Sequence, residues 1–158
     1  MTIRAMTIDD YEAVHALWNA CLASPRGVDD TPGAIGRFLL RNPGLSVVAV
    51  EGAPHNHPGT AHPPSREGNA LIGSILCGHD GRRGYLYHVA VDAAHRRGGV
   101  GQAMLRACLD ALRAEGIHKC ALIAFTSNDS GNAFWEAMAF EAREDFYYRE
   151  RWLDESEA

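Results

Sequence analysis

The segment from Tyr85 to Gly116 constrains the fold most, because three structural signals follow one another in it. Residues Tyr85 to Val91 form a near-continuous apolar run, which predicts a central strand covered on both faces. Apolar residues then recur at helical spacing from Val100 to Leu112, and Gly116 supplies a C-terminal stop. A strand that leads through a short turn into a helix predicts parallel pairing with a crossover connection, and therefore an α/β fold.

The rest of the chain supplies the other elements of a mixed α+β sheet. The expected strands are Ile3–Met6, Leu45–Glu51, Ala70–Cys77, Cys120–Phe125 and Phe146–Arg149. One helix is expected after the capping signal of Thr7 and Asp10, a second after the N-cap Thr31, and a third over Ser130–Met138.

Length and composition favour a single domain over residues 1–158. The 158 residues are 46% hydrophobic, enough to bury a core without cross-links. A stretch rich in proline and histidine predicts a flexible insertion at about 52–69. The formal charge of −5 offers no basic surface to nucleic acid or to an anionic membrane. No apolar run approaches the roughly eighteen residues of a membrane span and no leader pattern occurs, so a cytoplasmic location is expected.

Cysteine and histidine give no sign of a cross-link or a metal site. The four cysteines lie far apart and mostly inside apolar periodic segments, which favours small core residues over a disulfide framework or a zinc site. His55, His57 and His62 fall in the insertion, whose proline and glycine give little rigidity to preorganise metal ligands. We therefore expect no bound metal.

The turn over residues 95–102, His-Arg-Arg-Gly-Gly-Val-Gly-Gln, carries the chemistry. Glycine lets the backbone approach a ligand closely, and the first N–H groups of a helix have no partner inside it. The helix dipole adds about half a positive charge and the two arginines add whole charges, so the turn suits an anion such as pyrophosphate. Its spacing fits neither a P-loop nor the Gly-x-Gly-x-x-Gly of a dinucleotide fold. From these residues alone, a glycine turn that binds nothing remains the alternative.

Two motifs extend this reading. Arg96, Gly99 and Gly101 give Arg-x-x-Gly-x-Gly after a valine-rich strand, and Asn128, Trp135 and Phe140 follow downstream. In these motifs and in the order of its expected elements the sequence resembles the Gcn5-related N-acetyltransferase (GNAT) family. The resemblance implies an acyl-CoA N-acyltransferase fold whose central strands splay around a pantetheine cleft. It also implies direct transfer of an acetyl group from acetyl-CoA to a primary amine of a small molecule or a peptide N-terminus, by a monomer or a homodimer.

The resemblance also assigns site residues by position. The residues expected to bind acetyl-CoA are Val89, Ala90, Val91, Arg96, Arg97, Gly98, Gly99, Val100, Gly101, Gln102, Asn128 and Trp135. Tyr85 and Tyr87 stand where several relatives hold a base or a proton relay, so they are the catalytic candidates, and a backbone N–H near Val89 would stabilise the oxyanion. Strict strand alternation places His88 on the opposite face from the two tyrosines, which favours a core histidine over a catalytic one.

The sequence departs from the family pattern at two positions. Trp135 stands where most members carry a tyrosine that protonates the leaving thiolate, and an indole N–H cannot supply that proton. Solvent, Tyr147 or Tyr148 would then have to do so. Ala139 stands where glycine is usual. The missing tyrosine motivates an alternative function, a sensor or interaction module that binds acyl-CoA without turning it over.

Overall fold

The computed structural model describes residues 1–22, 28–52 and 69–153. The chain divides into two compact units, unit 1 over Met1–Ile123 and unit 2 over Ala124–Ala158, and each is described by itself. Most of the expected insertion at 52–69, including its three histidines, lies outside the described residues. Among the helices within them, none is long and apolar enough to cross a membrane.

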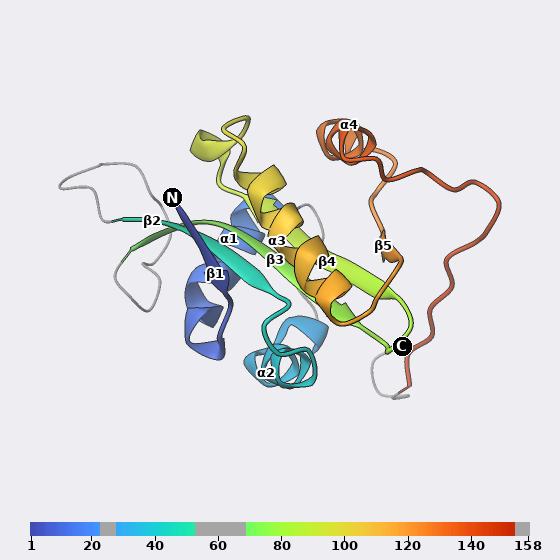
Figure 1. The fold of residues 1–158 in the computed structure, drawn as a ribbon, viewed down its shortest axis with the longest axis horizontal. Coiled ribbons are helices and arrows are strands. Elements are labelled where there is room, and N and C mark those ends of the chain that lie inside the picture. The colour runs from blue at the N-terminus through green and yellow to red at the C-terminus, as the bar shows by residue number, and fades with distance from the viewer. Residues whose placement is uncertain (23–27, 53–68, 154–158) are drawn as a thin grey trace. The chain divides into compact units, whose positions relative to one another are not determined.

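Unit 1 is built on a five-stranded sheet with the strand order β1-β2-β3-β4-β5 (Figure 1). The strands are β1 Thr2–Ala5, β2 Val47–Glu51, β3 Ala70–His79, β4 Gly84–Val91 and β5 Cys120–Leu122. The first four pair antiparallel in sequence order, whereas β4 and β5 are parallel and are joined by the crossover helix α3, Val100–Ala114. The mixed α/β sheet expected from the sequence is therefore confirmed.

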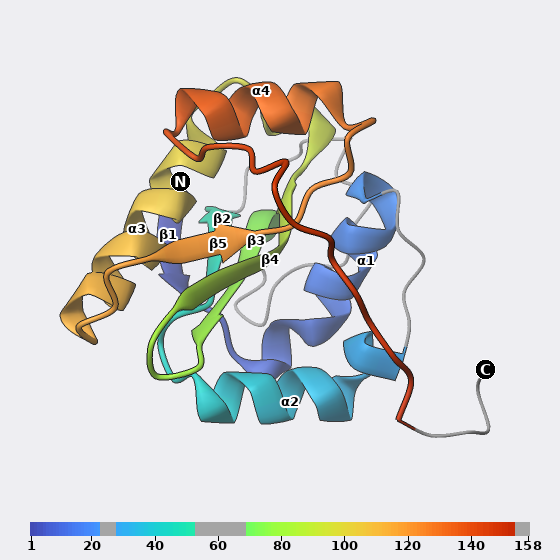
Figure 2. The same cartoon turned by 90° about the vertical axis from the view of Figure 1, so that its right-hand side faces the viewer.

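Helices cover both faces of this sheet (Figure 2). Besides α3, unit 1 contains α1 Tyr11–Cys21 and α2 Pro32–Arg41. Two adjacent residues of β3 identify the faces. The Ser74 hydroxyl accepts a hydrogen bond from Trp18 Nε1 of α1 at 2.9 Å, whereas Gly73 lies against the Met104 side chain of α3. Because successive strand residues point to opposite faces, α1 and α3 lie on opposite sides of the sheet.

Local signals fix the start of α1 as the sequence predicted. The Thr7 backbone N–H donates to Asp10 Oδ2 at 3.0 Å, and a short 3₁₀ helix, Ile8–Asp10, precedes the α-helix. Asp10 is fully buried, and its carboxylate also accepts two hydrogen bonds from the Arg4 guanidinium, each at 2.8 Å. This bidentate pair ties β1 to the helix and gives the buried charge its partner.

A β-bulge interrupts β4 at His88. Between the cross-strand pairs Leu76–Tyr87 and Ser74–Ala90, two residues of β4 oppose one residue of β3. His88 has a φ of 47°, in the left-handed region that residues other than glycine seldom adopt. One extra residue shifts the in-and-out alternation of the strand from that point on.

Unit 2 contains the helix α4, Asp129–Ala137, and its described residues include no strand. Asn128 caps the helix, since its Oδ1 accepts a hydrogen bond from the Gly131 N–H at 3.1 Å. The expected last strand, Phe146–Arg149, is wrong: this segment is irregular and its side chains are exposed. A strand needs a partner for its backbone hydrogen bonds, and the described part of unit 2 offers none.

The end of α4 explains the position where the family prefers glycine. Ala139 has a φ of 61°, and its N–H donates to the Glu136 carbonyl at 3.0 Å while the Phe140 N–H donates to the Trp135 carbonyl at 2.9 Å. These two bonds form a Schellman motif, whose left-handed residue is usually glycine. The chain forms the motif with alanine in that place.

Candidate functional site

The strands β4 and β5 separate where the site begins. Parallel pairing joins Gly84–Leu86 to Cys120–Leu122, and β5 ends there. The second half of β4, from Tyr87 to Val91, contains the bulge and has no pairing with β5. Unit 1 therefore has the splayed strands that the sequence analysis expected around a pantetheine cleft.

The three strand residues expected at the donor differ in their surroundings. Ala90 is buried in the core beneath α1. The Val91 carbonyl accepts hydrogen bonds from Arg96 Nε at 3.1 Å and from the Cys21 thiol at 3.5 Å, so it has partners within the protein. Val89 is the second residue of the bulge and is half-buried. Its role as the backbone contact to the thioester stays a prediction.

The glycine turn has the geometry of an anion site. Arg97 and Gly99 both have left-handed backbones, with φ of 62° and 82°, and Gly99 is the N-cap of α3. Among the described residues no side chain caps this helix start, and Val100 is buried while residues 96–99 are exposed. The first N–H groups of α3 have no partner inside the helix, and they follow an exposed turn with two left-handed residues.

Side chains before the turn hold it against the sheet. Asp92 Oδ1 lies 2.8 Å from His95 Nδ1 and also accepts a hydrogen bond from the Ala94 N–H at 3.0 Å. The other ring nitrogen of His95 lies 3.3 Å from Glu51 Oε2, at the end of β2. The hydrogen bond to Asp92 raises the pKa of His95, and Glu51 adds to this effect against partial desolvation. A protonated His95 therefore joins both carboxylates directly in front of Arg96.

The turn fits the pyrophosphate of coenzyme A in charge and in hydrogen-bonding capacity. The uncapped N–H groups of α3 are donors, the helix dipole favours an anion at this end, and Arg96 and Arg97 add two positive charges beside it. Gly98 lies at the surface, and a Cβ added there would meet the His95 carbonyl at 3.4 Å. Gly101 and Gln102 continue the first turn of the helix. The groups available to a ligand here are backbone N–H donors and positively charged side chains, and both suit a phosphate.

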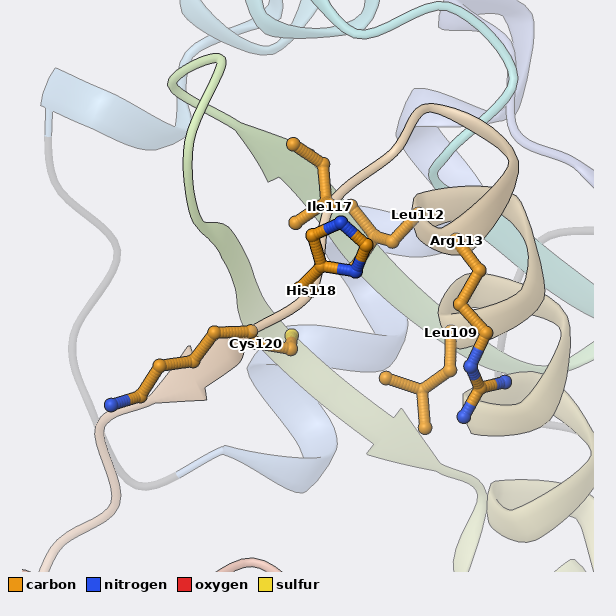
Figure 3. Close-up of a pocket in the computed structure, with 7 residues that line it drawn as sticks. Leu109, Leu112, Arg113, Ile117, His118 and Cys120 are labelled. Carbon is orange, nitrogen blue, oxygen red and sulfur yellow. The ribbon is translucent and has the colours of Figure 1, made fainter.

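A surface cavity of about 260 Å³ lies at the other end of α3 and does not belong to this site. It is lined by Leu112, Arg113, Ile117 and Cys120, among others, where α3 runs into β5 (Figure 3). The fifteen residues of α3 span roughly 22 Å, so the cavity is far from the N–H groups of the turn. It adjoins the negative end of the helix dipole, which does not favour an anionic ligand.

The catalytic candidates Tyr85 and Tyr87 lie on the face of β4 that α2 covers. Their rings stack with centroids 6.2 Å apart, and Phe38 of α2 contacts Tyr87 edge-on at 5.9 Å. Tyr87 is 45% exposed, so this aromatic group reaches the surface. The catalytic role of the two tyrosines stays a prediction.

The orientation expected for His88 is wrong. Its ring lies 4.5 Å from the Trp18 ring of α1, on the same face as Tyr87 rather than on the α3 face. The bulge is the cause, because the inserted residue lets two consecutive side chains point to one side. A period-two pattern cannot register such an insertion, although a left-handed backbone at His88 is a conformation that histidine tolerates better than most residues.

The structure adds Asp30, on the short 3₁₀ helix Val28–Asp30, to the candidate residues beside His88. Its Oδ1 lies 2.5 Å from His88 Nε2, and its side chain is only 9% exposed. The Tyr11 hydroxyl donates to the Asp30 carbonyl at 2.8 Å. Burial raises the pKa of Tyr11, helped by the charges of Glu12 and Asp30, so the hydroxyl remains a donor. No local pattern could connect residues that are 58 positions apart in the sequence.

Two expected donor contacts belong to unit 2. Asn128 caps α4, and the Trp135 ring packs edge-on against Phe134 and Phe140 at 4.9 and 5.3 Å. Each side chain therefore has a structural role within that unit. Their contact with the donor remains a prediction from the family resemblance.

Two thiols of unit 1 have unfavourable surroundings for nucleophilic chemistry, and all four cysteines are free. The hydrogen bond with Cys77, together with burial, raises the pKa of Cys108 far above its usual range, and burial raises that of Cys120 to about 12. Thiols held in the protonated form are poor nucleophiles.

Within the described residues, no group of three or more His, Cys, Asp or Glu side chains could hold a metal ion. His55, His57 and His62 lie outside those residues.

Comparison with known proteins identifies the family. Residues 36–140 match the model of the acetyltransferase (GNAT) family. An acetyltransferase of Photorhabdus laumondii is 31% identical over 144 residues, which cover 90% of this chain and 88% of that protein.

Solved structures have the same fold. The NatC complex bound to Gag peptide and CoA superposes with a TM-score of 0.71 at 20% identity, over 90% of this chain and 86% of that one. The ribosomal-protein-S18-alanine N-acetyltransferase from Escherichia coli gives 0.65 at 19% identity, over 89% and 77%. With the family model matched over most of its length and the mixed sheet in place, this chain is an acetyltransferase that belongs to the GNAT family.

Proposed function

We propose that this chain transfers the acetyl group of acetyl-CoA directly to a primary amine, of a small molecule or at a peptide N-terminus. GNAT proteins use acyl-CoA, and CoA is bound in the NatC structure named above. The proposal goes beyond the family assignment in two respects: it names acetyl as the group that is transferred and a primary amine as the acceptor.

One observation carries the donor assignment: the uncapped start of α3 follows the splayed half of β4, and Arg97 and Gly99 are both left-handed there. The pyrophosphate would accept hydrogen bonds from the N–H groups of Gly99, Val100 and Gly101 and would pair with the arginines. The second half of β4, which has no pairing with β5, would flank the pantetheine arm.

Replacing Gly99 by alanine tests this assignment against a matched control. Gly99 and Gly81 both have positive φ, 82° and 91°, and an added Cβ meets nothing within 4 Å at either position. Each Gly→Ala change therefore costs about 1 kcal/mol of backbone strain without a steric clash. Only Gly99→Ala is expected to weaken CoA binding, by roughly tenfold in calorimetric titration. Equal CoA affinity in the two variants would reject the turn as the donor site.

The energetics of the acceptor amine narrow the choice of substrates to test. An amine with a pKa near 10.4 costs about 4–5 kcal/mol to deprotonate at pH 7, whereas an α-amine near 8 costs about 1 kcal/mol. Asp29 is exposed on the short 3₁₀ helix Val28–Asp30 before α2, where its charge would attract a cationic amine. A panel of peptides with free N-termini, lysine analogues and small primary amines, assayed for thiol release from acetyl-CoA, identifies the acceptor.

Trp135 supports a second candidate, an acyl-CoA sensor without turnover. Its indole cannot protonate the leaving thiolate, although a thiolate of pKa near 8.5 is only about 2 kcal/mol from its protonated form at neutral pH. Tight CoA binding with no thiol release from any acceptor in the panel would favour the sensor. Thiol release above the no-acceptor rate would reject it.

A further inference from the structure

The bulge in β4 turns His88 to the face of the sheet that α1 covers, which is also the face of the catalytic candidate Tyr87. The imidazole packs on Trp18, whose indole N–H is fixed by Ser74, and the His88 side chain is 25% exposed. Val89, the next residue, is the one whose backbone N–H is expected to face the thioester oxygen. His88 is thus the chain neighbour of the residue expected to contact the reacting thioester carbonyl. It also lies on the same face of the sheet as the partly exposed ring of Tyr87.

A buried carboxylate orients the imidazole. Asp30 Oδ1 lies 2.5 Å from His88 Nε2, and the main chain of Asp30 is itself held by the Tyr11 hydroxyl. Asp30 directly precedes Thr31, which caps α2 by accepting a hydrogen bond from the Ala34 N–H at 3.3 Å. A base held by a carboxylate that is fixed in turn by a helix start has the arrangement of a positioned general base.

We propose that His88 is the general base of the acetyl transfer and that Asp30 positions it. This inference rests on the proposed function, because it names the group that accepts the proton from the acceptor amine. Neither residue was assigned a catalytic part by the family resemblance, which pointed to Tyr85 and Tyr87 instead.

The proton and electron balance is simple. Because an ionised carboxylate only accepts hydrogen bonds, Asp30 fixes the tautomer with the proton on Nε2, so the imidazole takes up a proton at Nδ1. As the amine nitrogen bonds to the acetyl carbon, its excess proton passes to Nδ1, directly or through one water. The C–S bond breaks, the electron pair leaves with sulfur as the thiolate, and solvent protonates the thiolate. Asp30 stabilises the imidazolium through the hydrogen bond at Nε2.

Imidazole suits this task better than the neighbouring phenols. A phenol has an ordinary pKa near 10 and holds its proton at neutral pH, whereas an imidazole titrates near 6.5 and can accept one. The His88 ring contacts Asp30 of the 3₁₀ helix and Trp18 of α1. Asp30 carries the charge that favours the imidazolium. Tyr11, which donates to the Asp30 carbonyl, and Tyr87, the preceding residue of β4, are titratable groups nearby.

The pH dependence of kcat/KM in wild type and His88→Gln tests the proposal, with the amine of highest kcat/KM from the panel as acceptor. Glutamine keeps a donor near the Nε2 position for Asp30 but has no basic nitrogen. The variant is expected to lose about 10²-fold in kcat with little change in KM for acetyl-CoA. In wild type, kcat/KM should fall at low pH for two reasons, protonation of the acceptor amine and protonation of His88. The variant should keep the first fall and lose the second. His118→Gln, at the far end of α3, is the matched control and should keep both.

Two further variants test the roles of the carboxylate and of the imidazole separately. Asp30→Asn should lower kcat and move the acid limb to lower pH, because the carboxylate no longer favours the imidazolium. His88→Gly suits the positive φ and leaves space beside Trp18, so free imidazole should restore part of its activity while leaving wild type unaffected. Wild-type turnover with an unchanged rate and pH profile in a folded His88→Gln protein would overturn the base assignment and leave the proposed function standing. Absence of wild-type turnover would instead refute the proposed function and this inference with it.

Discussion

Gly73→Ala should loosen the start of α3 and thereby weaken CoA binding from inside the core. Gly73 lies on β3, paired with Val91 at the end of β4, and faces α3. A Cβ there would lie 2.7 Å from Met104 Cε, 3.0 Å from its sulfur and 3.2 Å from Val100 Cγ1. Met104 is fully buried, so its flexible tip can move only by repacking against its core neighbours, and Val100 is the first residue of the helix that forms the turn.

The magnitude follows from two opposing effects. Inserting a methyl group into a packed core costs about 1–3 kcal/mol, and replacing glycine by alanine returns about 0.4–1 kcal/mol through the entropy of the unfolded chain. The net loss is about 1–2 kcal/mol, or roughly a tenfold larger unfolding constant. Urea denaturation followed by circular dichroism should therefore show a midpoint about 0.5–1.5 M lower.

Gly84→Ala is the matched control because it strains the other end of the same helix. A Cβ at Gly84 would lie 2.7 Å from Leu112 Cδ1, in the last turns of α3. Both variants should lose similar stability, but only Gly73→Ala should weaken CoA binding, by several-fold in calorimetric titration. In the Gly73→Ala/Met104→Ala double variant the two changes should couple by more than about 0.5 kcal/mol. Strict additivity, or CoA affinity unchanged in Gly73→Ala, would refute the steric reasoning.

Two further predictions concern a helix end and a titrating side chain. Ala139→Gly should stabilise α4 by about 0.5–1 kcal/mol, because glycine relieves the left-handed strain of the Schellman motif; a lower thermal midpoint for this variant would contradict that reasoning. His95 has a raised pKa through its hydrogen bond to Asp92, so the stability that it contributes is fully present below about pH 6.5 and is lost as the pH rises through the raised value. The difference in unfolding free energy between wild type and His95→Gln should accordingly shrink from pH 6 to pH 9, and a difference that grew with pH would exclude the carboxylate contacts as its source.

Features that depend on a few neighbouring residues could be predicted from the sequence. The glycine turn was predicted from its residues, and the structure adds that Arg97 as well as Gly99 supplies the left-handed backbone. The capping pair of Thr7 and Asp10 was predicted likewise. Each depends on one backbone conformation and its nearest hydrogen-bond partners, which nearby residues largely determine. The mixed sheet followed from the order of such elements and the need of each to bury an apolar side.

Contacts between distant segments could be decided only by the tertiary structure. Phe146–Arg149 has the composition of a strand but no partner within the described part of unit 2, so composition alone misled. The direction of His88 depends on the register between β3 and β4, where one inserted residue reverses the side to which every later side chain points. Its meeting with Asp30 joins positions 58 residues apart. The sequence by itself thus determined the family's fold and the turn suited to the donor's phosphates, because both are encoded locally. The candidate base on the acceptor side emerged only from strand register and helix packing, which belong to the folded chain as a whole.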